Sequence, residues 1–148
     1  MTILEAIQQA SNDTTGIVGL SFANLQEFNA FKQSFDYQDW PRNIVIPPTV
    51  TGEYRNNRLK LTLQLRGWIL RRIAEDTNDW RSVQLEPVYI NPMRMLAFSF
   101  VRKMLNTDFI DPEREIASIT VTPEYMFLDN HVFGVSYQAN IPILSHVC

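Results

Sequence analysis

Three side chains with reactive chemistry lie near the C-terminal end of the sequence: His131, His146 and Cys148. A histidine acts as a metal ligand or acid–base group only with a second ligand or carboxylate nearby. Asp129 is the only carboxylate close to His131 in the sequence. Cys148 is the only cysteine and has no neighbouring base that would activate it. These residues therefore indicate a surface turn and a tail, with no catalytic or metal site.

An acidic cluster lies further up the chain, at Asp108, Asp111, Glu113 and Glu115. Carboxylates at close spacing can hold a hard cation such as calcium. The spacing is not that of an EF-hand, however, and Arg114 sits inside the cluster, which favours a solvated loop. The five glycines are scattered, and the sequence contains neither HExxH nor GxSxG. We therefore expect a protein that is not an enzyme, without cofactor or metal.

Basic side chains gather around one strand-like segment, where they could contact phosphate or an acidic partner. The alternative interpretation is that these side chains only form the solvated face of a strand. The net charge of −3 gives no bulk basic field that would draw the chain onto nucleic acid or an anionic membrane. A local contact remains open for Arg55, Arg58, Lys60 and Arg66, with Arg71 and Arg72 at the far end.

Aromatic residues stand near the predicted loops and hairpin ends, where core anchoring and interface contact are alternative roles. They are Trp40, Trp68, Trp80, Tyr37 and Tyr54. Together with the basic residues, a double proline and one polar strand face, they define a candidate interface. Its members are Trp40, Pro47, Pro48, Tyr54, Arg58, Lys60, Arg66, Ser136, Gln138 and Asn140.

The totals fit one globular domain across residues 1–148, with a 45% hydrophobic and a 20% charged share. We divide it into an N-terminal helical part (1–35), a core (36–143) and a tail (144–148). No apolar run approaches the roughly 20 residues of a spanning helix. The N-terminus has neither a basic region nor a long apolar one, so we expect no signal peptide. A single cysteine suits a reducing cytoplasm.

Two segments alternate as half-buried strands do. In Val132–Ile143 the odd-numbered residues are apolar and the even-numbered ones are mostly polar. Twelve residues reach roughly 40 Å as a strand, which needs partner strands and a cover. The second segment alternates from Leu59 to Leu65, after a predicted turn at Asn56 and Asn57. The apolar parity changes at Gly67, which predicts a bulge or twist there.

Helical spacing predicts two helices. Residues 2–12 place Ile3, Leu4, Ile7 and Ala10 on one face. Asn91–Leu105 has apolar residues at i, i+3, i+4 and i+7, with Asn91 as N-cap and Pro92 at the first helical position. This helix is the predicted cover of Val132–Ile143. Residues 24–35 fit either a capped helix or a partly extended arm.

The remaining segments predict short strands and loops. Residues 17–22 read as a short strand, and 44–55 as an extended segment that Pro47 and Pro48 interrupt. Residues 71–81 are a charged loop. Residues 116–122 form a strand that Pro123 breaks and 125–128 resume. The predicted fold is α+β, an antiparallel sheet of two hairpins with helices packed on one face.

Four stretches carry a resemblance to a known family: DWPRNIVIPPTVTGEY, LKLTLQLRGWIL, NPMRMLAFSFVRKML and NHVFGVSYQANIPI. With the order of elements, they resemble the tail-terminator or tail-completion (neck) proteins of tailed bacteriophages, over residues 36–143. The resemblance implies a structural virion protein that forms a closed ring, a hexamer or larger, where head and tail join. It implies head-completion, connector or tail-tube proteins as partners and no cofactor.

The same resemblance implies assembly in the bacterial host cytoplasm, a final place in the virion neck or tail, and at most DNA passing through the lumen. A tail terminator and a connector remain alternatives at this point. The other open hypothesis is a non-enzymatic cellular α+β binding module that uses the outer sheet face. A pocket lined by Trp68 and Tyr137 would favour the binding module.

Overall fold

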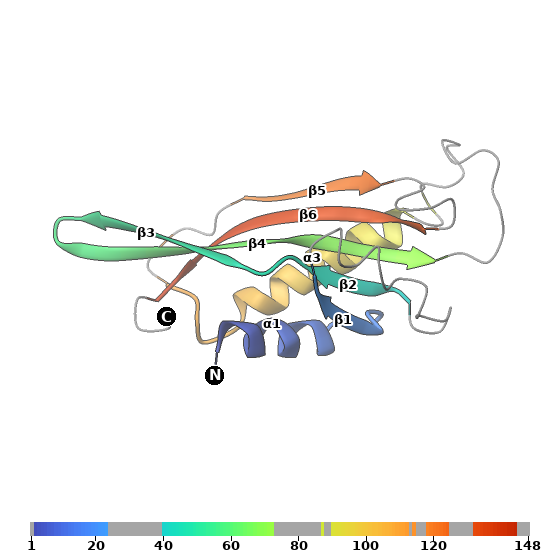
Figure 1. Cartoon of the computed structure of the whole chain (residues 1–148), viewed down its shortest axis with the longest axis horizontal. Helices are drawn as coiled ribbons and strands as arrows, with labels where there is room; N and C mark the ends of the chain where they lie inside the picture. The colour runs from blue at the N-terminus through green and yellow to red at the C-terminus, as the bar shows by residue number, and fades with distance from the viewer. Residues whose placement is uncertain are drawn as a thin grey trace.

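Strand β6 (Val132–Ile143) lies inside a six-stranded mixed sheet against which two helices pack, so the fold is α+β (Figure 1). This computed structural model describes residues 2–23, 40–72, 87, 90–112, 114, 118–124 and 132–144. The helices are α1 (Ile3–Asn12) and α3 (Asn91–Leu105). The other strands are β1 (Gly19–Phe22), β2 (Arg42–Val45), β3 (Thr49–Arg55), β4 (Arg58–Arg72) and β5 (Ile119–Glu124).

The strand order is β1-β2-β4-β6-β5, and β3 also pairs with β4. All neighbouring strands are antiparallel except β1 and β2, which run parallel. The prediction of a purely antiparallel sheet was therefore wrong. A parallel pair needs a long connection, and the chain between Phe22 and Arg42 supplies it.

Both predicted antiparallel pairs are present, and the tight turn of the first is confirmed. Asn56 and Asn57 connect β3 to β4 with φ values of 53° and 63°, as a type I′ turn requires. Pro123 does not break β5, contrary to the prediction, because β5 is an end strand whose free side needs no ladder hydrogen bonds. The predicted segments at 24–35 and 125–128 lie outside the described residues. In the predicted loop at 71–81, Arg71 and Arg72 instead belong to β4, where they pair with β6, and the remainder lies outside the described residues.

The double proline falls where β2 and β3 succeed each other along one side of β4. Val45 pairs with Gly67, and Thr49 pairs with Gln64, so three residues stand opposite two. The Ile46 amide donates to the Arg66 carbonyl at 3.0 Å and keeps this bulge attached to β4. Pro47 and Pro48 therefore sit where no ladder bond is needed, one of the predicted placements.

Strand β4 keeps its parity through Gly67, so this strand has no bulge there, the first of the two predicted alternatives. Its pairing with β6 is uninterrupted from Leu61 to Arg72. A Cβ on Gly67 would lie 2.3 Å from the Ile44 carbonyl oxygen and 2.7 Å from Tyr137 Oη. The glycine makes room for these two groups. The apolar residues at even-numbered positions of β4, Trp68 and Leu70, serve a second, smaller core. This core is made of Ala23, Trp40, Ile44, Leu70 and Val132, and Trp68 packs against it.

Helix α3 covers the main core, as predicted. Met93, Ala97, Phe100, Val101 and Met104 are its buried residues, and the Phe100 and Tyr137 rings meet edge to face at 5.7 Å. The N-cap is Ile90, without a side-chain hydrogen bond, and not Asn91 as predicted. Asn91 Oδ1 instead accepts a hydrogen bond from Arg94.

Helix α1 packs into the same core with Ala6, Ile7 and Ala10, on the same side of the sheet as α3 (Figure 1). Thr2 and Glu5 form a capping box at its start, because each side chain bonds the other's backbone amide. Leu4, predicted on the buried face, is half exposed.

A buried polar chain links the sheet to α1. Tyr137 Oη donates to Asn43 Oδ1 at 2.7 Å, and Asn43 Nδ2 donates to Ser11 Oγ at 3.4 Å. Burial raises the pKa of the Tyr137 phenol, because the charged form would lose its solvation. Tyr137 is therefore a neutral donor inside the core and has a structural role.

Candidate functional site

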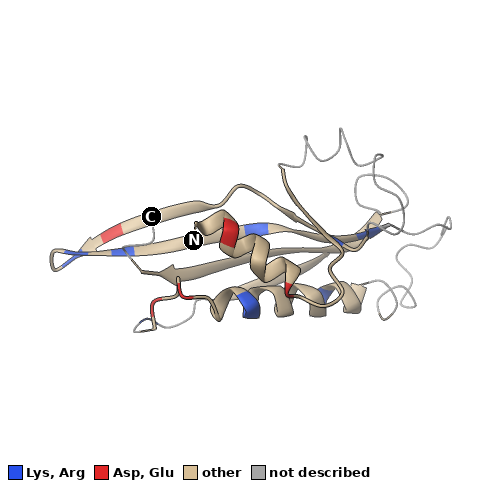
Figure 2. Ribbon diagram, turned by 90° about the horizontal axis from the view of Figure 1, so that it is seen from below, with Lys and Arg blue, Asp and Glu red and all other residues tan. Residues whose placement is uncertain are grey.

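The β3–β4 hairpin extends beyond the rest of the sheet as an arm, which we define as residues 51–60. Pairing of β4 with β6 ends at Leu61, opposite Ile143, so the strand continues from there with β3 alone. Every residue of the arm is exposed. Figures 1 and 2 show it projecting past both helices. The three residue pairs beyond Leu61 place the turn roughly 10 Å beyond the body.

One face of the arm is apolar and continues the stripe that fills the main core. Gly52 stands opposite Leu61, and Tyr54 stands opposite Leu59. Directly opposed residues share a face, and Leu61 is already buried as part of the main core. Beyond that cover, Tyr54 is 75% exposed and Leu59 is 36% exposed. The arm therefore presents an apolar pair to solvent.

The other face of the arm is charged. Glu53 stands opposite Lys60, and Arg55 stands opposite Arg58. Glu53 Oε1 accepts from Arg55 Nε at 2.9 Å. Arg58 and Lys60 pair with no carboxylate among the described residues. The arm thus carries three cations against one carboxylate, in a chain whose net charge is −3.

Arg114 holds the base of the arm. Its Nη2 donates to the carbonyl oxygen of Leu61 and, at 3.4 Å, to that of Ile143. Its Nε lies 3.2 Å from Asp111 Oδ2, and Arg114 is largely shielded from solvent. The guanidinium therefore ties the segment after α3 to the ends of β4 and β6. This contact fixes the direction in which the arm leaves the sheet.

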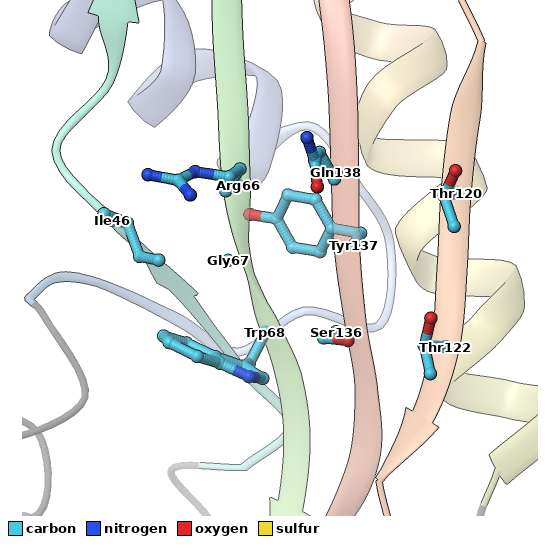
Figure 3. A pocket seen from close by; sticks show the side chains of 9 residues that line it. All are labelled: Ile46, Arg66, Gly67, Trp68, Thr120, Thr122, Ser136, Tyr137 and Gln138. Atoms are coloured by element: carbon cyan, nitrogen blue, oxygen red, sulfur yellow. The ribbon is translucent and has the colours of Figure 1, made fainter.

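The second exposed surface is the outer face of the sheet, opposite the helices. Arg66 stands beside Gln138, which in turn stands beside Thr120, and Trp68 stands beside Ser136, which in turn stands beside Thr122. A shallow groove of about 190 Å³ lies over these strands (Figure 3). The groove is lined by Ile46, Arg66, Gly67, Trp68, Thr120, Thr122, Ser136, Tyr137 and Gln138.

Trp68 and Tyr137 both line this groove, as the binding-module hypothesis expects, although the Tyr137 side chain is itself buried in the core. The groove is small, however, because pockets for drug-sized ligands run from about 300 to 1,000 Å³. Its polar lining consists of hydroxyls and amides around one cation, Arg66. Such a surface can hydrogen-bond a small polar ligand or the face of another protein.

A third hollow lies between the C-terminal ends of α1 and α3, and we call it the inter-helix groove. It has a volume of about 370 Å³. Its lining includes the exposed carboxylates of Asp13 and Asp108, the cation of Lys103 and the mostly buried ring of Phe109. The remaining lining residues are Gln9, Ala10, Asn106 and Thr107.

The structure divides the predicted interface residues among different places. Tyr54, Arg58 and Lys60 lie in the arm, and Pro47 and Pro48 form the bulge at its root. Trp40 is only 5% exposed and belongs to the second core, so it presents no surface for contact. The outer sheet face holds Arg66, Ser136, Gln138 and Asn140.

Sequence reasoning missed the inter-helix groove and the Arg114 contact. Asp13 and Asp108 are 95 positions apart in the printed sequence, and no local pattern joins them. A usable signal was present, because each carboxylate comes shortly after the end of a predicted helix. Arg114 was noted only as a charge that weakens a cation site, which agrees with its contact to Asp111.

No group of three or more metal-binding side chains forms in the described part of the chain. His131, His146 and Cys148 lie outside it, as do Glu113 and Glu115. None of the described helices is long and apolar enough to cross a bilayer.

Comparison with known proteins gives no family. No protein-family profile matches the chain, and no curated protein matches its sequence.

Proposed function

We propose that this protein is a structural virion component of a tailed bacteriophage that acts by assembling into a closed ring. The ring, a hexamer or larger, is a tail terminator or a neck connector between head and tail. Its further partners are head-completion, connector or tail-tube proteins, and DNA passes through its lumen. The subunit is made in the bacterial cytoplasm and ends in the virion.

The observation that carries this proposal is the arm. Its ten residues form regular secondary structure and are all exposed. A two-stranded hairpin is marginally stable by itself in water, so a long one outside the body suits a contact with another chain. The resemblance of the sequence to tail-terminator proteins, which includes the arm's own GEY and LKL residues, points to the same kind of contact.

The edges of the sheet support assembly as well. Strands β1 and β5 end the strand order, and each leaves one side without a partner strand among the described residues. Open edges invite uncontrolled pairing unless a neighbour, a charge or a proline protects them. β5 carries Pro123. A ring of subunits would cover such edges, because every subunit contributes the same two surfaces to its neighbours.

Mass measurement of the purified full chain tests the proposal. We expect particles of six or more copies of the 17.2 kDa chain, with ring outlines in electron micrographs. Portal, head-completion and tail-tube genes beside the coding gene would support the phage assignment. A chain that stays monomeric at every accessible concentration, and also in the presence of tail-tube or head-completion proteins, overturns the proposal.

The groove on the outer sheet face favours a second candidate, a non-enzymatic binding module of the same fold. Arg66 and Trp68, both from β4, line this groove, with Thr120 and Thr122 of β5 beyond β6 (Figure 3). Titration with small polar fragments and short peptides, followed by the tryptophan indole signals in NMR spectra, tests this function. Saturable shifts that disappear in Trp68→Ala support the module. An unchanged spectrum with every probe removes it.

A further inference from the structure

We propose that the arm docks into the inter-helix groove of a second copy of this chain. In this contact Arg58 and Lys60 face Asp13 and Asp108, and the Tyr54–Leu59 pair lies against the apolar part of the groove. The inference rests on the proposed ring function and names the contact that would build the ring. Each subunit gives its arm to one neighbour and its groove to the other.

Each face of the arm has side chains that a partner surface would stabilise. On the charged face Arg55 and Arg58 stand directly opposite each other, and like charges in that position destabilise a strand pair. A carboxylate from outside would relieve this repulsion. On the other face Tyr54 and Leu59 remain in water, although their stripe is continuous with the core. The arm therefore suits a partner surface that is acidic and partly apolar.

The inter-helix groove has that character. The C-terminal ends of α1 and α3 both reach it, and helix C-termini attract cations through their unpaired carbonyl groups and dipoles. Helix α1 has no basic residue in its last turn, whereas Lys103 already serves α3. Asp13 and Asp108 add exposed carboxylates, and the Phe109 ring, which is only 7% exposed, lies at the floor of the groove.

The geometry excludes a contact within one molecule. Arg114 fixes the base of the arm, and the arm continues the line of β4 away from both helices (Figures 1 and 2). The groove lies between those helices. An arm can therefore reach only the groove of another molecule.

The charges indicate whether the arm of one subunit binds the arm of another subunit or the remainder of that subunit, its body. Two arms would bring three cations each into one contact and would repel. The body is more acidic than the whole chain, because the arm is net positive and the chain has a charge of −3. Arm-to-body contact is heterologous, and heterologous contacts close into rings when the rotation between subunits allows it.

Protein fits the arm better than DNA does. Glu53 lies among the three cations and binds Arg55, so few positive charges remain for phosphates. The exposed Tyr54–Leu59 pair is on the opposite face from Arg55 and Arg58. A phosphate backbone would engage only the charged face, whereas a groove whose lining has both carboxylates and apolar atoms can engage both.

Charge exchange in the full chain tests the docking. The arm variant is Arg58→Glu with Lys60→Glu, and the groove variant is Asp13→Lys with Asp108→Lys. All four positions are exposed, and lysine is favourable at a helix C-terminus, so both variants should fold. Arg71→Glu is the matched control, an exposed cation at the other end of the same strand. Assembly is measured by light scattering, and folding by circular dichroism.

We expect each variant alone to associate roughly tenfold or more weakly than the wild type, because like charges would face each other. An equimolar mixture of the two should regain assembly, since each reversed arm then meets a reversed groove. Arg71→Glu should assemble as the wild type does. The recovery of the mixture is decisive, because an unfolded variant could not restore it.

Two results overturn the docking and leave the ring intact. One is normal assembly of the arm variant, and the other is loss of assembly that mixing does not restore. Loss of binding to a short DNA duplex, with normal assembly, assigns the arm to DNA and also overturns the inference. A wild-type chain that never assembles overturns the ring itself and is recognised without any variant.

Discussion

The two halves of strand β4 have the same alternating pattern and opposite environments. From Leu61 to Leu70 the strand lies between β6 and the β2–β3 side, and Leu61, Leu63 and Leu65 are buried in the main core with residues of both helices. From Arg58 to Lys60 it has only β3 beside it, and Leu59 is exposed. The difference comes from what covers each part, because strand β6 ends where the arm begins and the arm projects past both helices.

The two parts of β4 show that an amphipathic strand is not necessarily a buried one. Alternation says that a strand has one apolar face, and it does not say that the chain itself covers that face. In the body the apolar face is closed by α1 and α3, and the residues there decide global stability. In the arm the same face is open, so its residues are available for association. Substitutions in the two halves should therefore act on different measurements.

The largest contrast is expected between Phe100 and Tyr54. Phe100→Ala empties a fully buried site against Tyr137 and should lower the free energy of unfolding by about 3–5 kcal/mol. Tyr54→Ala should change it by less than about 0.5 kcal/mol, because the side chain is mainly in water. Urea denaturation measures both. A strongly destabilised Tyr54→Ala protein would mean that the arm is part of the core.

Two glycines give the next contrast. A Cβ on Gly134 would lie 2.1 Å from the Ile69 carbonyl oxygen, so Gly134→Ala should cost about 1–3 kcal/mol of stability. In the arm, a Cβ on Gly52 would meet only the side-chain ends of Leu59 and Leu61 at 3.3 Å. These ends can move, and Gly52→Ala should leave the thermal midpoint nearly unchanged. Equal losses at the two sites would refute the distinction.

Tyr137→Phe probes the polar chain inside the body. It leaves Asn43 Oδ1 without its donor and should cost about 1–3 kcal/mol. The raised pKa of Tyr137 adds a pH dependence. The unfolded phenol ionises near its ordinary pKa of about 10, while the folded one stays neutral, so stability is present below pH 10 and falls above it. Unfolding free energies between pH 8 and pH 11 should fall less steeply for Tyr137→Phe than for the wild type.

The smallest effect on global stability is expected at the turn of the arm. Asn57 has a φ of 63°, in the left-handed region, where an alanine is about 1–2 kcal/mol less stable than in a right-handed conformation. Because the arm contributes little to the core, Asn57→Ala should loosen the arm and hardly move the thermal midpoint. Hydrogen exchange should quicken at the paired amides of residues 51–60 and stay unchanged in β6. Faster exchange throughout the sheet would contradict the separation of the two halves.

Much of the body could be predicted from the sequence. The strand at Val132–Ile143, the helix at Asn91–Leu105 and the Asn56–Asn57 turn each follow from a local pattern, and each is found. The parallel pairing of β1 with β2 could not be predicted, since it depends on segments that the long connection between them brings together. The N-cap of α3 was misplaced by one residue, because Asn91 bonds Arg94 and leaves the cap to Ile90.

The candidate site was predictable only in part. Tyr54, Arg58 and Lys60 were recognised as contact residues by type, and they do lie on an exposed arm. Trp40 is of an equally suitable type and is buried, because the apolar residues Ile44, Leu70 and Val132 meet around it. Side-chain chemistry does not state which neighbours a residue acquires. The groove that holds Asp13 and Asp108 arises only when α1 and α3 pack together.

The sequence by itself determined the local periods: which residues alternate, where a turn with positive φ is possible, and which helix face is apolar. These depend on neighbours a few positions apart, so the chain encodes them directly. Only the tertiary structure decided how far the cover reaches along β4. Helices α1 and α3 and strand β6 end before residues 51–60, and the same stripe of apolar side chains becomes core on one side of that boundary and open surface on the other.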